Sequence, residues 1–168
     1  MVRPVNFMQQ IQAMHSDAPD SDAGYWIPRR NFILGRWVRH AGWWPDAQLR
    51  LLRRGRARYD EARDPHELVL LDGAEGRLTE TLTHYNYTNL GQLFAKQDAY
   101  ARREAQRLQR EGVRPRPHKF VTMPAREFLW RFVQLEGYKE GPLGLLLGLV
   151  MAWYQVRIYQ HLRRLPPR

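Results

Sequence analysis

An uncharged stretch near the C-terminus limits the folds open to this chain. Gly141 to Val156 is a run of 16 residues without a formally charged side chain. A membrane-spanning helix needs roughly 20 apolar residues, so the run is too short to predict a span. Trp153 and Tyr159 lie near its cationic end, which is typical of a helix lying in the interface of an anionic membrane. The alternative is a buried core helix that closes the domain.

The C-terminal half as a whole has a helical pattern. Apolar side chains recur at helical spacing from Asn89 to Glu111, and we expect further helices over Pro124 to Gly137 and Pro142 to Leu162. The helix expected from Pro124 begins with proline, as helices often do. Gly144 and Gly148 are four residues apart in the third and would allow close helix packing. Three helices are therefore predicted.

The N-terminal half consists of shorter segments. Residues 4–15 are expected to form a short amphipathic helix, followed by a polar loop. Extended structure is expected over 25–30 and 32–34 with a break at Pro28, a turn over 42–45, and strands over 67–71 and 78–87. Residues 47–54 are either a strand or a helix start. The fold class is predicted as α/β, with short mixed strands followed by three C-terminal helices.

The composition is that of one globular domain with a strong basic bias. The 168 residues carry a net charge of +10, and 24 of the 27 basic residues are arginine. Arginine binds phosphate and carboxylate as a bidentate fork, so the bias suits a phosphorylated ligand. A GC-rich coding sequence would produce the same bias. The chain has no cysteine, which excludes disulfides and thiolate metal sites.

The basic charge also suits binding to nucleic acid or to an anionic membrane surface. No helix-turn-helix, zinc-ligand set or RNA-recognition signature is present in the sequence. We therefore predict an anionic membrane surface as a partner and no nucleic acid. No signal-peptide pattern is seen at the N-terminus, so we expect a cytoplasmic location.

The densest group of candidate site residues lies between Gly24 and Glu67, where four of the six tryptophans fall. Within it, Asp46 follows Trp-Trp-Pro, and no other acid occurs before Asp60. A carboxylate beside Trp and Pro is partly desolvated, which raises its proton affinity and suits it to general-base work. The alternative is that Asp46 is the N-cap of a helix.

Other polar residues suggest metal or phosphate chemistry. A neutral imidazole can bind a divalent metal and a neighbouring acid can orient it, so His66 and Glu67 are candidates, with a structural role as the alternative. His84 alternates with apolar neighbours and is expected to be packed or hydrogen bonded. The aspartates of the sequence Asp-Ser-Asp at 20–22 are interpreted as part of a solvated loop, because no apolar strand precedes them.

Lys96 and Tyr100 lie four residues apart in the predicted helix over 89–111, and residues at this spacing share a helix face. Their side chains suit contact with a phosphate or an acceptor. Solvation at the surface is the alternative.

Several sequence blocks, in the same order, resemble the second half of family-2 glycosyltransferases, in particular bacterial enzymes that build lipopolysaccharide core and related cell-surface glycans. The blocks are GYWIPRRNFILGRWVRHAGWWPDAQLRLLRR, DPHELV and LTHYNYTNLGQLFAKQDAYARREAQRL. The resemblance runs from about Gly24 to the C-terminus. It implies a partial GT-A (Rossmann-like) fold and an inverting transfer of a sugar from a nucleotide-sugar donor.

The resemblance also implies roles for individual residues. Asp46 matches the acid at the start of the helix beneath the acceptor, which acts as the base. His66 matches the histidine of a metal site for Mg²⁺ or Mn²⁺, and Glu67 would lie beside it at the acceptor. The residues expected to bind substrate are Trp43 and Trp44 in the sugar cleft, Arg50 and Arg53 near the diphosphate, and Lys96 and Tyr100.

The donor-binding half of such enzymes has no counterpart among the resembling blocks. We therefore expect residues 1–88 to be the acceptor-side portion of a GT-A domain, and residues 89–168 to be a helical region associated with the inner face of the cell membrane. The implied acceptor is lipid-linked or a cell-surface glycan. The chain by itself is expected to bind metal and nucleotide poorly and to be inactive. The alternative function is a non-catalytic basic module that binds the membrane surface.

Overall fold

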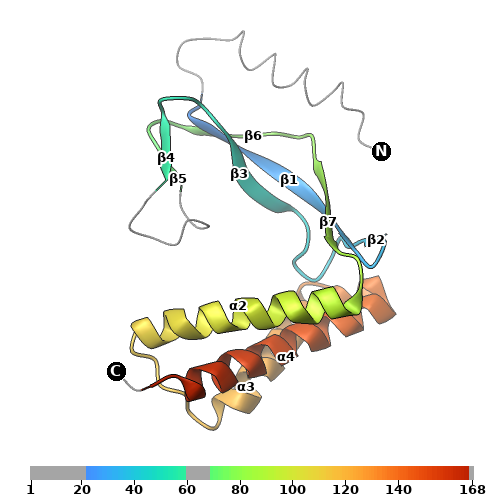
Figure 1. The fold of residues 1–168 in the computed structure, drawn as a ribbon. Coiled ribbons are helices and arrows are strands. Elements are labelled where there is room, and N and C mark those ends of the chain that lie inside the picture. The colour runs from blue at the N-terminus through green and yellow to red at the C-terminus, as the bar shows by residue number, and fades with distance from the viewer. Residues whose placement is uncertain (1–21, 60–68, 167–168) are drawn as a thin grey trace. The chain divides into compact units, whose positions relative to one another are not determined.

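The strands and helices belong to two compact units. The computed structural model describes residues 22–59 and 69–166. The described residues of the first unit are 22–31, 44–59 and 69–84, and we call it the strand unit; those of the second are 32–43 and 85–166, and we call it the helical unit. Strands come first and three helices follow, so the predicted α/β class and element order are confirmed (Figure 1). The division at residue 88 remains a prediction.

β1 is the central strand of a five-stranded sheet. It spans Gly24–Ile33 and pairs antiparallel with β2 and β3, parallel with β6, and also with β7. The bounds of these partners are Arg36–Trp37 for β2, Asp46–Leu52 for β3, Glu75–Arg77 for β6 and Leu82–Tyr87 for β7. A separate pair, β4 and β5, spans Ala57–Tyr59 and Val69–Leu71.

β1 runs without interruption through Pro28, where the sequence predicted a break. Proline fixes φ near −65° and lacks an N–H, but an extended backbone tolerates that φ, and the missing donor matters only where it would meet a partner. The antiparallel register with β3 continues through this position and pairs Pro28 with Ala47, whereas pairing with β6 ends at Trp26 and pairing with β2 begins at Phe32. The two predicted segments are therefore one strand.

The segment after the tryptophan pair is also a strand. The predicted turn over residues 42–45 is observed, with a cis peptide bond between Trp44 and Pro45. β3 begins at Asp46, so the strand alternative for residues 47–54 is correct and the helix start is wrong. The strands predicted over 67–71 and 78–87 are observed as the shorter β5 and β7. The helix predicted over residues 4–15 lies outside the described residues.

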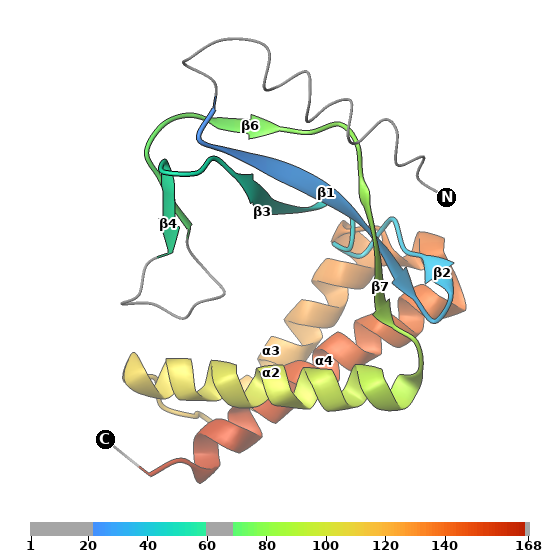
Figure 2. The same ribbon diagram turned by 45° about the horizontal axis from the view of Figure 1, so that its top comes forward.

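The helical unit consists of three helices that lie side by side in both ribbon views (Figures 1 and 2). Its helical segments are α2 at Leu90–Arg110, α3 at Lys119–Leu129, the π-helix η1 at Trp130–Gln134, the 3₁₀ helix η2 at Gly137–Glu140, and α4 at Pro142–Arg164. Two clusters of buried side chains hold them together. One contains Ile33, Val38, Tyr87, Leu93, Leu143, Leu147 and Val150, and the other contains Ala101, Ala105, Ile158, Tyr159 and Leu162.

α2 begins and ends where the sequence predicts. Asn89 Oδ1 accepts a hydrogen bond from the Gln92 N–H at 2.8 Å, and Gln92 Oε1 accepts one from the Thr88 N–H at 2.8 Å. Such reciprocal capping gives partners to amides that the helix itself leaves without acceptors. Gly112 follows the last turn with a φ of 75°, in the left-handed region that favours glycine. The predicted helix is confirmed.

The second predicted helix begins before its proline. α3 starts at Lys119, and Pro124 lies inside the helix instead of opening it. Phe120 and Met123 pack against the buried cluster that contains Ala101, so packing holds the residues before the proline in helical conformation. Pro124 has no N–H to donate to the Phe120 carbonyl, and this packing offsets the cost of the missing bond.

α4 matches the third predicted helix and is largely a core element of its unit. Its buried side chains include Leu143, Leu147 and Ile158, whereas Leu145 and Leu149 are 44% and 54% exposed. Among the described residues, α4 is the one helix long and apolar enough to cross a membrane, and 44% of its most apolar window is buried. Core helices of soluble proteins meet the same criterion. Membrane contact therefore remains a proposal.

Candidate functional site

Asp46 is surrounded by polar partners in the strand unit. Its Oδ2 accepts hydrogen bonds from Arg29 Nη2 at 2.6 Å, Arg29 Nε at 3.1 Å and Asn31 Nδ2 at 2.8 Å. Its Oδ1 accepts one from Gln48 Nε2 at 3.1 Å. The Asp46 side chain is 25% exposed and that of Arg29 16%. The isolated acid of the sequence is therefore a charge-balanced and oriented carboxylate.

The pairing of β1 with β3 places these residues together. Arg29 lies directly opposite Asp46 in the antiparallel register. Side chains alternate along a strand, so Asn31 shares the face of Arg29, and Gln48 shares the face of Asp46. Because directly opposed residues share a face, all four side chains lie on one side of the sheet. Asp46 is thus the first residue of a strand, and its predicted place at the start of a helix is wrong.

The polar network continues from Asp46 to a histidine. Asn31 is fully buried, and its Oδ1 lies 2.8 Å from His84 Nδ1 on β7. The hydrogen-bonded histidine predicted from the sequence is therefore confirmed. Because Asn31 also donates to Asp46, its amide fixes both neighbours. Sequence reasoning did not single out Arg29, Asn31 or Gln48, although the alternation Arg-x-Asn and Asp-x-Gln in two pairing strands was the available signal.

The arrangement has one chemically distinctive atom. Among the described residues, Asp46 Oδ1 receives a single hydrogen bond, whereas Oδ2 receives three. A carboxylate has about four acceptor positions, so Oδ1 retains capacity to accept a further hydrogen bond. The site can therefore present one oriented carboxylate oxygen, on a side chain that is partly exposed, to a hydroxyl group.

The two tryptophans predicted to line a sugar cleft belong to different units. Trp44 is half-buried in the strand unit. Trp43 is half-buried in the helical unit, where its ring packs edge-on against Tyr87 with centroids 6.2 Å apart and lies 5.9 Å from the Arg131 guanidinium. Trp43 thus contributes to packing within its unit. A role for either ring in binding sugar remains a prediction.

The loop that carries Trp43 is tied to the helical segments by two charged side chains. Glu140 Oε1 accepts hydrogen bonds from the backbone N–H groups of Arg39 at 2.8 Å and His40 at 3.0 Å, and lies 2.8 Å from His40 Nδ1. Arg131 Nη1 donates to the Ala41 carbonyl at 2.9 Å. Burial alone would raise the pKa of Glu140, but these hydrogen bonds outweigh it and lower the pKa.

The remaining predicted site residues have varied surroundings. Arg50 is exposed on β3 at a register irregularity, since Leu49 and Leu51 pair with successive residues of β1. Arg53 is exposed just after β3. Lys96 Nζ donates to the Asn86 carbonyl at 3.0 Å, so it already supports the junction between β7 and α2. Tyr100 is 46% exposed. Substrate contacts of these residues remain predictions.

The predicted metal ligand cannot be placed. His66 and Glu67 lie outside the described residues, as do Asp20 and Ser21 of the Asp-Ser-Asp sequence. Within residues 22–59 and 69–166, no group of three His, Asp or Glu side chains is arranged to hold a metal ion. A metal site therefore stays an expectation that depends on His66.

The chain is similar to LpsC of Rhizobium meliloti (strain 1021), a lipopolysaccharide core biosynthesis glycosyltransferase. The two are 29% identical over 157 residues, which cover 85% of this chain and 55% of that protein. The chain thus spans about half the length of the curated relative it matches. The similarity supports a relationship to glycosyltransferases. No protein-family model matches the chain, and no solved structure matches it significantly.

Proposed function

We propose that this chain forms the acceptor-side part of a family-2 glycosyltransferase of GT-A fold, which transfers a sugar with inversion from a nucleotide-sugar donor to a lipid-linked or cell-surface glycan acceptor. The observation that carries the proposal is the similarity to a lipopolysaccharide core glycosyltransferase over 85% of the chain. The oriented carboxylate of Asp46 gives this relationship a chemical centre.

In the proposed reaction, Asp46 takes the proton of the acceptor hydroxyl on Oδ1. The hydroxyl oxygen forms a bond to the anomeric carbon while the bond from that carbon to the diphosphate breaks, so the nucleoside diphosphate leaves and the configuration inverts. Arg29 and Asn31 hold the carboxylate through Oδ2 and leave Oδ1 facing the acceptor. Holding a base in a fixed position contributes to rate by orientation.

The other predicted residues complete the proposal. Glu67 acts beside the acceptor, Trp43 and Trp44 stack on sugar, and Arg50 and Arg53 supply positive charge near the diphosphate. Lys96 and Tyr100 contact the acceptor. A divalent metal, Mg²⁺ or Mn²⁺, would neutralise charge on the diphosphate, with His66 as its ligand from this chain.

The test is sugar transfer by the full natural polypeptide that contains these residues. Asp46→Asn preserves the size of the side chain and removes its basicity, so the transfer rate is expected to fall by at least about 100-fold, the typical contribution of a general base. Asp72→Asn is the matched control, because Asp72 is an exposed acid of the same unit, and should transfer at the normal rate. Near-normal transfer by Asp46→Asn would rule out Asp46 as the base.

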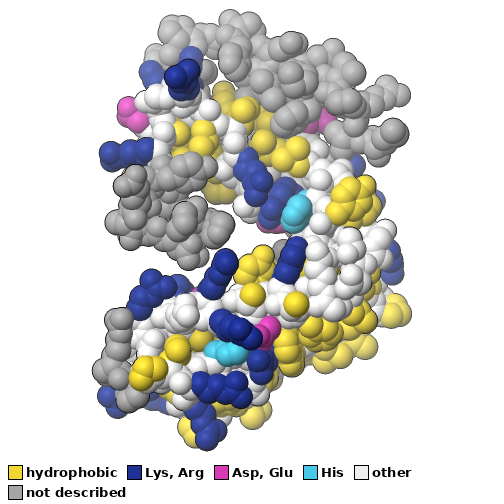
Figure 3. Space-filling model, viewed as in Figure 1, with side chains coloured by type: hydrophobic (Ala, Val, Ile, Leu, Met, Phe, Trp, Pro, Cys, Tyr) yellow, Lys and Arg dark blue, Asp and Glu magenta, His cyan; other side chains and the backbone are white. Residues whose placement is uncertain are grey.

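A second candidate function is a non-catalytic module that binds the inner face of the cell membrane. The observation in its favour is a set of exposed apolar side chains in the helical unit, where hydrophobic groups gather on one side of the view in Figure 3. They include Leu129, Trp130, Val133, Leu145 and Leu149. Such patches often mark membrane or protein contacts. Peripheral membrane binding is compatible with sugar transfer. If the parent protein shows no sugar transfer in the assay above, membrane binding is the candidate function that remains.

A further inference from the structure

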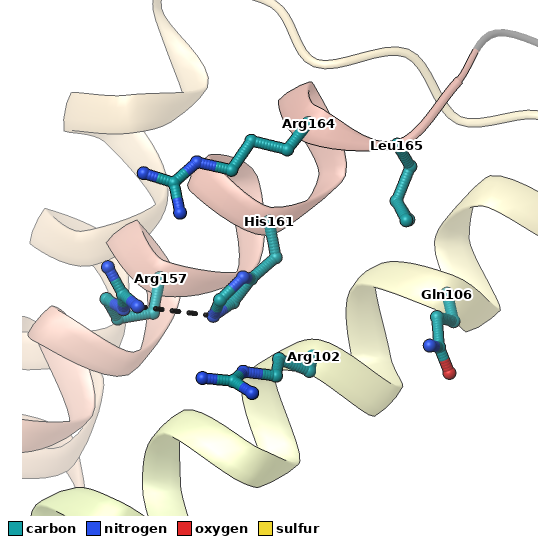
Figure 4. Close-up of a pocket in the computed structure, with 6 residues that line it drawn as sticks. All are labelled: Arg102, Gln106, Arg157, His161, Arg164 and Leu165. Atoms are coloured by element: carbon teal, nitrogen blue, oxygen red, sulfur yellow. Dashed lines mark hydrogen bonds between the residues drawn. The ribbon is translucent and has the colours of Figure 1, made fainter.

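A basic hollow of about 340 Å³ lies between α2 and α4 in the helical unit. Arg102 and Gln106 line it from α2, and Arg157, His161, Arg164 and Leu165 line it from α4 and the residue that follows (Figure 4). Its volume is at the lower end of the range for small-molecule sites, about 300–1,000 Å³. The hollow is therefore large enough for a small anionic group.

Small side chains determine how close the two helices come. Ala101 and Ala105 of α2 are fully buried in one cluster with Ile158 and Leu162 of α4. Arg102 directly follows Ala101, and Gln106 directly follows Ala105. Both side chains line the hollow beside this apolar contact. The apolar contact thus fixes the helices that carry the basic side chains.

Asp98 organises the cations around the hollow. Its Oδ1 accepts a hydrogen bond from Arg157 Nε at 2.6 Å and lies 3.0 Å from His161 Nε2, while Arg102 Nη2 lies 2.8 Å from Oδ2. The hydrogen bonds from Arg157 and His161 hold the pKa of the Asp98 carboxyl well below its usual range. Asp98 is therefore ionised at neutral pH, and both of its oxygens are engaged by the cations.

The contact with Asp98 also determines the proton on His161. An ionised carboxylate can only accept hydrogen bonds, so His161 Nε2 carries a proton and donates it to Asp98. Arg157 Nη2 lies 3.4 Å from the same nitrogen, a close approach that cannot then be a hydrogen bond. The His161 side chain is 13% exposed, so burial and the contact with Asp98 together fix the orientation of its ring.

Positive charge remains after Asp98 is satisfied. Three guanidinium groups line the hollow and one carboxylate faces them, and Arg164 makes no ion pair with any described residue. A phosphate monoester carries about −1.5 to −2 charges at neutral pH and accepts the forked donors of arginine. We propose that this hollow binds a phosphate monoester group, either of a soluble molecule or of a lipid headgroup.

A purely structural role does not require this arrangement. One cation would neutralise Asp98 and join α2 to α4. Basic residues in the last turn also interact favourably with the helix dipole, but Arg163 does this as well as Arg164, and Arg163 does not line the hollow. The comparison of these neighbours therefore separates a specific site from general positive charge. The inference rests on the helical unit alone and is independent of the proposed sugar transfer.

The test is calorimetric titration of the full chain with inorganic phosphate at low ionic strength. Arg102→Gln and Arg164→Gln are each expected to weaken binding by about tenfold or more, the effect of losing one charge-assisted hydrogen bond. The matched controls are Arg103→Gln and Arg163→Gln, which remove the same charge from adjacent exposed positions and should stay within about twofold of the parent. Thermal melts by circular dichroism verify that each variant is folded.

A second arm identifies the source of the phosphate. Flotation with phosphatidylcholine vesicles, with and without phosphatidic acid, is measured for the same four variants. Arg102- and Arg164-dependent binding of inorganic phosphate supports a soluble ligand, whereas dependence seen only with phosphatidic acid supports a lipid headgroup. Equal losses in the paired variants, or no binding of either probe, would overturn the proposal.

Discussion

At the scale of single residues, Glu140 shows how a buried charge can hold a loop in place. Its carboxylate is 7% exposed and accepts hydrogen bonds from two successive backbone amides, with the His40 ring beside them. Hydrogen bonds to a buried charged group typically contribute about 1.5–3 kcal/mol. Together with Arg131, which donates to the Ala41 carbonyl, Glu140 therefore holds the loop of residues 38–43 from a position distant in sequence.

Glu140→Gln keeps the shape and an acceptor oxygen but removes the charge, and we expect it to lower the free energy of unfolding by about 1–3 kcal/mol at pH 7. The pKa of Glu140 is lowered on folding from an ordinary value of 4.5. Its contribution is therefore fully present above pH 4.5 and is lost as the pH falls through the folded value. Urea unfolding of parent and variant from pH 7 to pH 3 should show a difference that shrinks on acidification.

The control for this prediction is Glu136→Gln. Glu136 lies four residues earlier and pairs with Lys139 at the surface, where an ion pair contributes little. This variant should unfold almost as the parent does at pH 7. A difference between parent and Glu140→Gln that stays constant from pH 7 to pH 3 would contradict the role of the charge.

The sequence identified Asp46 as a notable acid but could not reveal its partners. Arg29 is 17 residues away and meets Asp46 only because β1 and β3 pair in that register. Local pattern fixes which residues share a strand face, whereas register depends on the whole sheet. For the same reason, the beginning of β3 at Asp46 overrides its resemblance to a helix cap.

At the scale of elements, the periodicity of the helices was the most informative signal. α2 and α4 carry long stripes of apolar side chains and were predicted almost to their ends. α3 begins earlier than predicted, because Pro124 is typical of a helix start whereas the packing of Phe120 extends the helix upstream. A proline start signal depends only on local sequence. The residue at which a helix begins also depends on tertiary burial, which the sequence does not display.

The glycines of α4 provide a prediction for this packing. A Cβ on Gly144 would overlap the backbone carbonyl of Gly137, whereas a Cβ on Gly148 would meet the Phe128 ring at 3.2 Å. Backbone cannot move aside as a ring can. Both changes to alanine gain up to about 1 kcal/mol of helix propensity. We expect Gly144→Ala to destabilise by about 3 kcal/mol and Gly148→Ala to stay within about 1 kcal/mol of the parent.

Urea unfolding midpoints of the two glycine variants test this difference directly. Each variant serves as the control for the other, since both add one methyl group to the same helix. Equal midpoints for the two would show that η2 does not pack tightly against the first turn of α4.

At the scale of the whole molecule, a strong positive charge accompanies exposed apolar side chains. The net charge is +10, and the exposed apolar side chains of α4 are joined by those of α3 and η1. The sequence favours α4 as a membrane element by its residue pattern, and its resemblance to glycosyltransferases implies membrane association for the whole of residues 89–168. It could not show that Leu143 and Leu147 face the core while Leu145 and Leu149 face solvent, because that depends on where α2 and α3 pack.

Deleting α4 is therefore unsuitable as a test of membrane binding, since it would remove the core of the helical unit. Leu145→Ser combined with Leu149→Ser instead changes only exposed side chains. Both leucines are about half exposed, so burying the exposed part of each in lipid contributes roughly 0.7–1.5 kcal/mol. The double variant should therefore bind phosphatidylglycerol vesicles at least about tenfold more weakly in a flotation assay. Leu70→Ser, an exposed leucine of the strand unit, is the control and should bind like the parent. Binding by the double variant that matches the control, and is abolished by high salt, would show that charge alone attracts the chain to membranes.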